Sequence, residues 1–180
     1  MCEHVVQFDE TLITRMAEGD GNAFQEIYQH TSSAVYGFAL SILKNRHDAE
    51  DVMHDTFLKA YSGAITYKPM GKPLAWILTI TKNLCYNKIR AGKVCEDIGE
   101  YDHFTAGDKS DVTADMIVLE AAMKTLAFEE RQIVILHALT GLKHREIAEI
   151  LGVPTGTVLS KYNRAIKKLR KEVEGKGESK

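Results

Sequence analysis

The chain has 180 residues, of which 44% are hydrophobic and 27% charged, and its formal net charge is −2. This composition is that of an ordinary globular protein and excludes collagen-like, low-complexity and fully disordered chains. No run of about 18 apolar residues is present and the acidic N-terminus lacks a secretory signal, so we expect no membrane insertion. The three cysteines form no C-x-x-C motif, which indicates reduced thiols in a cytoplasmic protein.

The charge is distributed unevenly along the chain. Residues 96–118 carry seven acidic groups and one basic group, whereas residues 119–180 have a net charge of +4. The window 56–95 holds seven basic residues and no acidic one, and residues 161–171 hold six basic residues and no acidic one. Two basic segments separated by an acidic one are typical of a protein with an anionic partner, which the near-zero total conceals.

Helical periodicity dominates and no strand alternation is convincing, so the predicted fold class is all-α. We expect two small helical domains joined by a flexible acidic linker. The first domain covers residues 1–92, and Pro69 and Gly71 predict a loop over residues 66–72. Its predicted helices are a short one with Leu12, Ile13 and Met16 on one face that ends at Gly19, a long one capped by Asn22, one capped by Asp48, and one from Pro73 to about Ala91.

Residues 93–113 form the predicted linker, because polar and acidic residues replace the helical periodicity there. The second domain, residues 114–180, contains predicted helices over residues 114–126, 128–139, 144–151 and 155–171. Gly152 ends the third of these, and a tight turn leads into the fourth, which is the pattern of a helix-turn-helix. The residues expected to pack these two helices together are Ile147, Ala148, Leu151 and Val158.

The last helix has an apolar face and a polar, basic face. Short polar side chains near the start of such a helix reach base edges in the major groove, and the cations beyond them neutralise phosphates. The pattern therefore predicts binding to duplex DNA, with a solvated basic helix in a bundle as the alternative. The residues expected to face outward are Thr157, Ser160, Lys161, Arg164, Lys167 and Lys168.

Two features of the first domain are unusual together. The segment DAEDVMHDTF, residues 48–57, places four acidic groups in two helical turns. Such a segment either docks on a basic partner or stabilises the start of its own helix. The acid-free window combines aromatic rings, amides and cations, which is typical of surfaces that stack single-stranded bases. Its outward face would carry Trp76, Asn83, Asn87 and Arg90, unless Trp76 lies in the core.

The segments DAEDVMHDTF, WILTITKN (residues 76–83) and REIAEILGVPTGTVLSKYNRAIKKL (residues 145–169) together resemble a bacterial RNA polymerase sigma factor of the extracytoplasmic-function type, within the sigma-70 family. The resemblance covers about residues 20–92 and 115–171. It implies a protein that binds core RNA polymerase, recognises the minus-ten and minus-thirty-five promoter elements, and promotes DNA melting. It also implies regulation by an anti-sigma factor and a linker that threads through the polymerase.

The resemblance implies a role for each residue that matches its motifs. The residues that would bind polymerase, chiefly the clamp helices of its beta-prime subunit and also its beta subunit, are Asp48, Glu50, Asp51, Asp55 and Phe57. Those that would bind unpaired bases of the minus-ten element are Tyr67, Lys68, Lys72, Trp76, Asn83, Asn87 and Arg90. Those that would bind the minus-thirty-five duplex are Thr157, Ser160, Lys161, Asn163, Arg164 and Lys167. Where the family usually has arginine this chain has Lys161, which lacks the bidentate fork, so Asn163 is the expected reader of adenine.

No motif indicates an enzyme. The histidines do not cluster at metal-ligand spacing and no nucleotide-binding motif is present, so no metal or other cofactor is expected. Cys85 is expected to be a core thiol. One alternative function is a helix-turn-helix transcription regulator without sigma activity on core polymerase, and another is a protein that mimics a sigma factor to occupy a partner. The acid-free window favours the sigma factor over the regulator, because a duplex-binding regulator has no need to stack bases.

Overall fold

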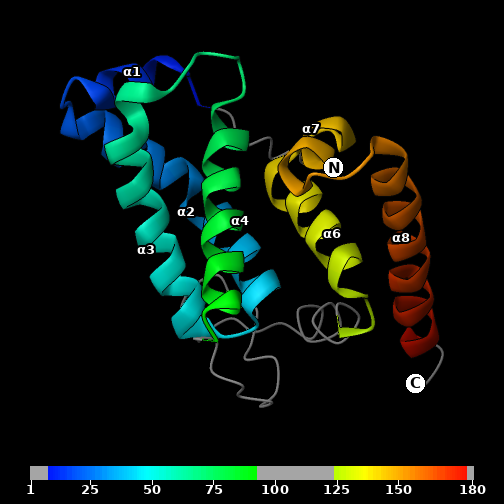
Figure 1. The fold of residues 1–180 in the computed structure, drawn as a ribbon. Coiled ribbons are helices and arrows are strands. Elements are labelled where there is room, and N and C mark those ends of the chain that lie inside the picture. Colours follow the sequence, from blue (N-terminus) through cyan, green and yellow to red (C-terminus); the bar gives the residue numbers. More distant parts are fainter. Residues whose placement is uncertain (1–7, 93–123, 178–180) are drawn as a thin grey trace.

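The computed structural model describes residues 8–92 and 124–177, and all regular elements within these ranges are helical (Figure 1). The predicted all-α fold class is therefore confirmed. The helices are α1 (Thr11–Ala17), α2 (Gly21–Leu43), α3 (Arg46–Gly63), the short 3-10 helix η1 (Ala64–Thr66), α4 (Pro73–Arg90), α6 (Phe128–Thr140), α7 (His144–Leu151) and α8 (Thr155–Gly177). The predicted linker, most of the predicted helix over 114–126, Cys2 and Cys95 lie outside the described residues.

Side-chain caps determine where α2 and α3 begin, and both predicted caps were wrong. Asp20 caps α2, because its Oδ1 accepts a hydrogen bond from the Asn22 amide at 2.9 Å. Asn45 caps α3, because its Oδ1 accepts from the Asp48 amide at 3.0 Å. Both capping residues have extended backbone, which aims a short polar side chain at the free amides of the first turn. Asn22 and Asp48 are already helical.

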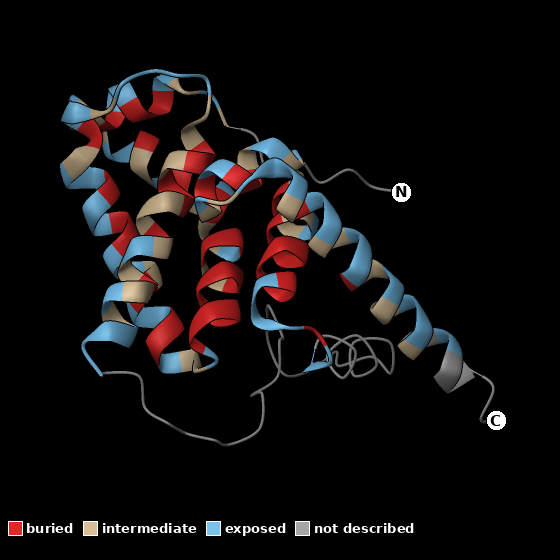
Figure 2. Ribbon diagram, turned by 45° about the vertical axis from the view of Figure 1, so that its right-hand side comes forward, coloured by how far each residue is buried: buried red, intermediate tan, exposed pale blue. Residues whose placement is uncertain are grey.

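One hydrophobic core joins the N-terminal half, residues 8–92, to the C-terminal half, residues 124–177. Helix α6 packs against α2, and α7 packs against α4. Residues such as Phe38 and Ile77 from the first half share a buried cluster with Leu136, Ile147 and Ile150 from the second. Figure 2 shows buried residues gathered where the helices face one another. The division into domains at residues 92 and 114 stays a prediction.

Helix α8 packs on α6 and α7 through one side only. Val158 and Ala165 are fully buried, and Tyr162 and Leu169 are half-buried beside them. Exposed and half-buried residues follow one another along most of its length (Figure 2). The predicted apolar face of this helix is confirmed, since these four residues pack inward.

Within the described part of the chain, no helix is long and apolar enough to cross a membrane. Cys85 lies in the core of the N-terminal half, as predicted. Burial raises the pKa of its thiol to about 12, so the thiol stays protonated at neutral pH. A protonated, buried thiol is a poor nucleophile, and Cys85 therefore serves the packing of α4.

Candidate nucleic-acid interface

The acidic segment of α3 divides into exposed and buried residues. Glu50, Asp51 and Asp55 are exposed on one side of the helix. Asp48 is buried, and its Oδ1 lies 2.6 Å from the Lys88 Nζ of α4. Phe57 is 3% exposed and packs in the core against Phe24 and Tyr28. The side chains presented to a partner on this face are therefore the three exposed carboxylates.

Lys88 is a central residue of this region that sequence reasoning did not single out. It joins α4 to α3, because its Nζ contacts Asp48 Oδ1 at 2.6 Å and Asp51 Oδ2 at 3.0 Å. Burial lowers the pKa of the Lys88 amine, but the two carboxylates outweigh burial and raise it. Lys88 is therefore charged at neutral pH. Its place two residues before the end of α4, in a segment without acidic neighbours, was the available signal.

The aromatic and basic residues predicted to bind the minus-ten element lie on the loop before α4 and along one face of α4. We call this set the predicted minus-ten surface: Tyr67, Lys68, Lys72, Trp76, Asn83, Asn87 and Arg90. Lys68, Asn83, Asn87 and Arg90 are exposed, and the other members are half-buried. The three exposed residues of α4 are spaced three or four apart, so they share one helical stripe.

Trp76 is neither a core residue nor fully exposed. Its ring centroid lies 4.8 Å from that of Tyr67, and it packs over Gly63, where an added Cβ would lie 3.6 Å from Trp76 Cζ2. The rest of the ring lines a pocket of about 260 Å³ together with Tyr67, Lys68 and Met70. The prediction that Trp76 faces outward and the alternative that it lies in the core are therefore each correct in part. One side of the ring packs against the protein, and another lines the pocket.

The C-terminal half covers part of the predicted minus-ten surface at the seam, which we define as the contact of α4 and its preceding loop with α7. Lys72 Nζ lies 2.6 Å from Glu149 Oε2 of α7. Lys82 Nζ donates to the Ile150 carbonyl at 2.5 Å. The hydrogen bond from Lys72 lowers the pKa of the Glu149 carboxyl, which is therefore ionised at neutral pH. Two lysines of the acid-free window thus bind the C-terminal half.

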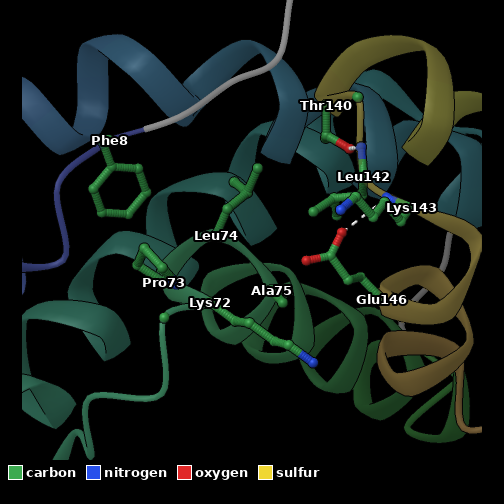
Figure 3. A pocket seen from close by; sticks show the side chains of 11 residues that line it. Phe8, Lys72, Pro73, Leu74, Ala75, Thr140, Leu142, Lys143 and Glu146 are labelled. Atoms are coloured by element: carbon green, nitrogen blue, oxygen red, sulfur yellow. Dashed lines mark hydrogen bonds between the residues drawn. The ribbon is translucent and has the colours of Figure 1, made fainter.

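A pocket of about 370 Å³ lies beside these contacts (Figure 3). Phe8 and Leu74 line it from the N-terminal half, and Leu142, Lys143 and Glu146 line it from the turn between α6 and α7 and from α7. The Glu146 carboxylate accepts from the Lys143 amide at 2.8 Å and so closes the first turn of α7. The pocket is therefore a gap beside the seam. The Glu146 carboxylate in its wall already accepts a hydrogen bond from within α7 and its N-cap.

The predicted minus-thirty-five residues of α8 also divide into two groups. Ser160, Asn163 and Lys167 are exposed, and Leu159 beside them is 43% exposed. Lys161 forms an ion pair with Glu129, and Arg164 Nε lies 4.0 Å from Glu130 Oε1, although the Arg164 side chain is still 64% exposed. Thr157 is half-buried. Ser160, Asn163 and Lys167 form a stripe along α8. Lys161 and Arg164 lie beside the glutamates at the start of α6.

Glu130 anchors this side of α8 and is a residue that the sequence analysis missed. It is 2% exposed, its Oε2 accepts from the Ala127 amide at 3.0 Å, and Lys168 Nζ donates to it at 2.7 Å. Burial raises the pKa of its carboxyl, but these hydrogen bonds and the two nearby cations outweigh burial and lower it. Its position three residues after Ala127, the residue before the helix start, was the signal for a capping glutamate.

Three rings hold α6, α7 and α8 together. His137 and His144 stack with centroids 5.0 Å apart, and Tyr162 meets both edge-on at 4.9 and 4.7 Å. Burial, and then the proximity of His137, lower the pKa of His144. Among the residues that the structure describes, no three His, Cys, Asp or Glu side chains are grouped so as to hold a metal ion. The rings are therefore a packing cluster.

Two family models match the chain, in the order of its two halves. The model for sigma-70 region 2 matches residues 27–94, and the model for sigma-70 region 4 matches residues 116–169. Together they cover more than half of the chain.

Named relatives agree with the family models. The chain is 28% identical over 174 residues to the ECF RNA polymerase sigma factor SigK of Mycobacterium tuberculosis, covering 89% of this chain and 91% of SigK. It is 34% identical over 168 residues to the ECF RNA polymerase sigma factor SigE of Mycolicibacterium smegmatis, covering 86% of this chain and 64% of SigE.

Two solved structures share the fold. One is RpoE bound to the anti-sigma factor NepR from Bartonella quintana, with a TM-score of 0.69, 22% identity, and coverage of 84% of this chain and 96% of that chain. The other is CnrH bound to the cytosolic domain of CnrY, with a TM-score of 0.65, 21% identity, and coverage of 93% and 97%.

Proposed function

The chain belongs to the sigma-70 family of RNA polymerase sigma factors, in its extracytoplasmic-function group, and we propose that it directs core polymerase to promoters. It binds core polymerase, recognises the minus-ten and minus-thirty-five elements, and promotes DNA melting for transcription initiation. The observation that carries the proposal is that region 2 and region 4 both match, in order, and that each half presents an exposed polar stripe.

We assign the surfaces as follows. The exposed carboxylates of α3, Glu50, Asp51 and Asp55, dock on the polymerase. The predicted minus-ten surface stacks and holds unpaired bases, since rings, amides and cations suit single-stranded DNA. The exposed stripe of α8 enters the major groove, with Asn163 as a reader of adenine and Lys167 as a phosphate contact. The chain acts by binding, in the cytoplasm, and RNA synthesis is the chemistry of the polymerase.

A helix-turn-helix regulator without sigma activity is not favoured. Such a regulator needs only the C-terminal half, whereas here region 2 matches most of the N-terminal half. The named relatives are sigma factors, and their matches cover 89% and 86% of this chain. An anti-sigma factor is a natural partner, since RpoE and CnrH, which share the fold, are each seen with a bound regulator or partner domain.

Run-off transcription with purified core polymerase tests the function. Promoters are first selected from a random DNA library by the polymerase with this chain added. We expect the chain to raise specific initiation on the selected fragments well above that of core polymerase alone. If no fragment is transcribed better with the chain than without it, the proposal is wrong. A chain that binds duplex DNA but not core polymerase would instead be a regulator.

We expect the free chain to bind single-stranded DNA weakly. Lys72 forms an ion pair with Glu149 across the seam, so its charge is not available to a phosphate. Replacing Glu149 by glutamine should raise the affinity for a fluorescent oligonucleotide about twofold to threefold and steepen the salt dependence by about 0.7 in log–log slope, the value for one phosphate contact. Fluorescence anisotropy at several salt concentrations measures both quantities.

The matched control is Glu26→Gln, which makes the same charge change at an exposed site on α2. An equal gain in both variants would show that net charge, and not the release of Lys72, is responsible. The gain from Glu149→Gln should also disappear when Lys72 is replaced by glutamine.

A further inference from the structure

A single carboxylate at the start of α1 binds the loop that carries part of the predicted minus-ten surface. Glu10 Oε1 accepts hydrogen bonds from the Tyr67 hydroxyl, from the Met70 amide at 2.8 Å and from the Gly71 amide at 3.0 Å. Its second oxygen, Oε2, lies 3.1 Å from the same Gly71 amide. One side chain thus binds three groups of a loop that is about 60 residues away in the sequence.

The Glu10 side chain binds this loop and does not cap its own helix. It is the N-cap residue of α1, yet its side chain forms no capping hydrogen bond. Asp9 serves that end of the helix instead, because its Oδ1 accepts from the Thr11 amide at 2.9 Å. The Glu10 carboxylate is therefore free to bind the loop, and the start of α1 is not left without an acceptor.

The carboxylate is ionised at neutral pH. The hydrogen bond from the Tyr67 hydroxyl lowers the pKa of Glu10, and partial burial only partly opposes it. Burial, and then the bond to Glu10, raise the pKa of the Tyr67 hydroxyl, which remains a donor. Hydrogen bonds to a charged acceptor are about twice as strong as those between neutral groups. The contact is accordingly a charge-assisted clamp.

The segment that Glu10 binds, residues 67–71, carries the loop side chains Tyr67, Lys68 and Met70. Gly71 has a φ of +68°, a conformation that other residues rarely adopt, so its amide direction depends on glycine. With the Tyr67 hydroxyl bound to Glu10, the Tyr67 ring lies against Trp76. Within the same loop, the side chain of Met70 is 77% exposed, and Lys68 is exposed as well. The clamp thus fixes one ring of the pocket wall and leaves two side chains projecting into solvent.

We propose that Glu10 is a positioning residue for minus-ten recognition, which holds the loop over residues 67–71 in the conformation that receives unpaired bases. The proposal rests on the proposed sigma function. Glu10 touches no base itself. It acts by lowering the conformational freedom that the loop would otherwise lose on binding DNA. The specificity for minus-ten bases therefore depends on a residue outside the segment that family region 2 matches.

The test compares holoenzymes that contain the wild-type chain, Glu10→Ala, Glu10→Gln, or the control Glu18→Ala, which removes an exposed glutamate at the other end of α1. Three quantities are measured: affinity for core polymerase, affinity for a duplex with only the selected minus-thirty-five element, and preference for a fork-junction fragment with the selected minus-ten bases over one with scrambled bases. For Glu10→Ala we expect that preference to fall about fivefold, with the first two quantities unchanged.

Glu10→Gln should restore much of the preference, because one amide oxygen can still accept from the loop, and Glu18→Ala should match the wild type. Gly71→Ala disturbs the same loop, so adding it to Glu10→Ala should cost less than the two single losses combined. An unchanged minus-ten preference in Glu10→Ala overturns the proposal, as does an equal loss in all three quantities, which indicates general destabilisation. A wild-type holoenzyme with no minus-ten preference overturns the proposed function itself.

Discussion

Replacing Trp76 with leucine is expected to reduce open-complex formation by about tenfold, because stacking of one base on an aromatic ring contributes about 1–3 kcal/mol. Leucine keeps an apolar side chain over Gly63 and beside Tyr67, so the local packing is largely retained. What it removes is the flat ring surface that lines the pocket beside Lys68 and Met70. Permanganate footprinting of unpaired thymines on a selected promoter measures the open complex.

The same variant should bind core polymerase with the affinity of the wild type, since the exposed carboxylates of α3 are untouched. Phe128→Leu is the control, because it removes a ring that is 36% exposed at the start of α6, outside the predicted minus-ten surface. Normal melting by Trp76→Leu would remove this ring from the proposed base-binding face. A loss in both variants would point to a general effect of ring removal.

Replacing Lys88 with methionine should lower the free energy of unfolding by about 3 kcal/mol. Methionine has a similar length and fills the space beside α3, but it leaves the buried Asp48 carboxylate without its cation. Removing one partner of a buried ion pair is costly because the remaining charge is neither solvated nor neutralised. Urea unfolding followed by circular dichroism at neutral pH gives the difference from the midpoint and slope.

Two companion variants separate the buried pair from loss of charge. Lys59→Met removes an exposed lysine of α3 and should change stability by less than about 0.5 kcal/mol. Combining Lys88→Met with Asp48→Asn should recover part of the loss, since the amide carries no charge. If Lys88→Met is as stable as Lys59→Met, the contact with Asp48 contributes nothing to the folded state.

The helices could be predicted from the sequence because their signals are local. Apolar spacing gave α1, α4, α6 and α7 to within a residue or two, and Pro73 and Gly152 marked a start and an end. Helix α8 runs to Gly177, beyond its predicted end at residue 171, and the starts of α2 and α3 were misjudged where several Asp and Asn residues compete as caps. Only the backbone conformation decides among them, and the sequence does not display it.

The candidate site was harder to predict because contacts between distant residues alter its side chains. Charge patterning and the family resemblance placed Asp48, Lys161 and Lys72 on functional surfaces, and each of them has an internal partner in the folded chain. Those partners lie more than 30 residues away in the sequence and are chosen by helix packing. No local pattern indicates them. Glu10 was missed for the same reason, since its partners lie on another segment.

The core that both halves share also governs how the protein opens. Helices α2 and α4 bury apolar side chains against α6 and α7, so loss of either half would expose the apolar face of the other. Elements that bury one another unfold as a single cooperative unit. Backbone amides in the middle of α2 and of α6 should then exchange with deuterium at similarly slow rates. A destabilising substitution in α7 should consequently speed the exchange of backbone amides in α4, which α7 contacts.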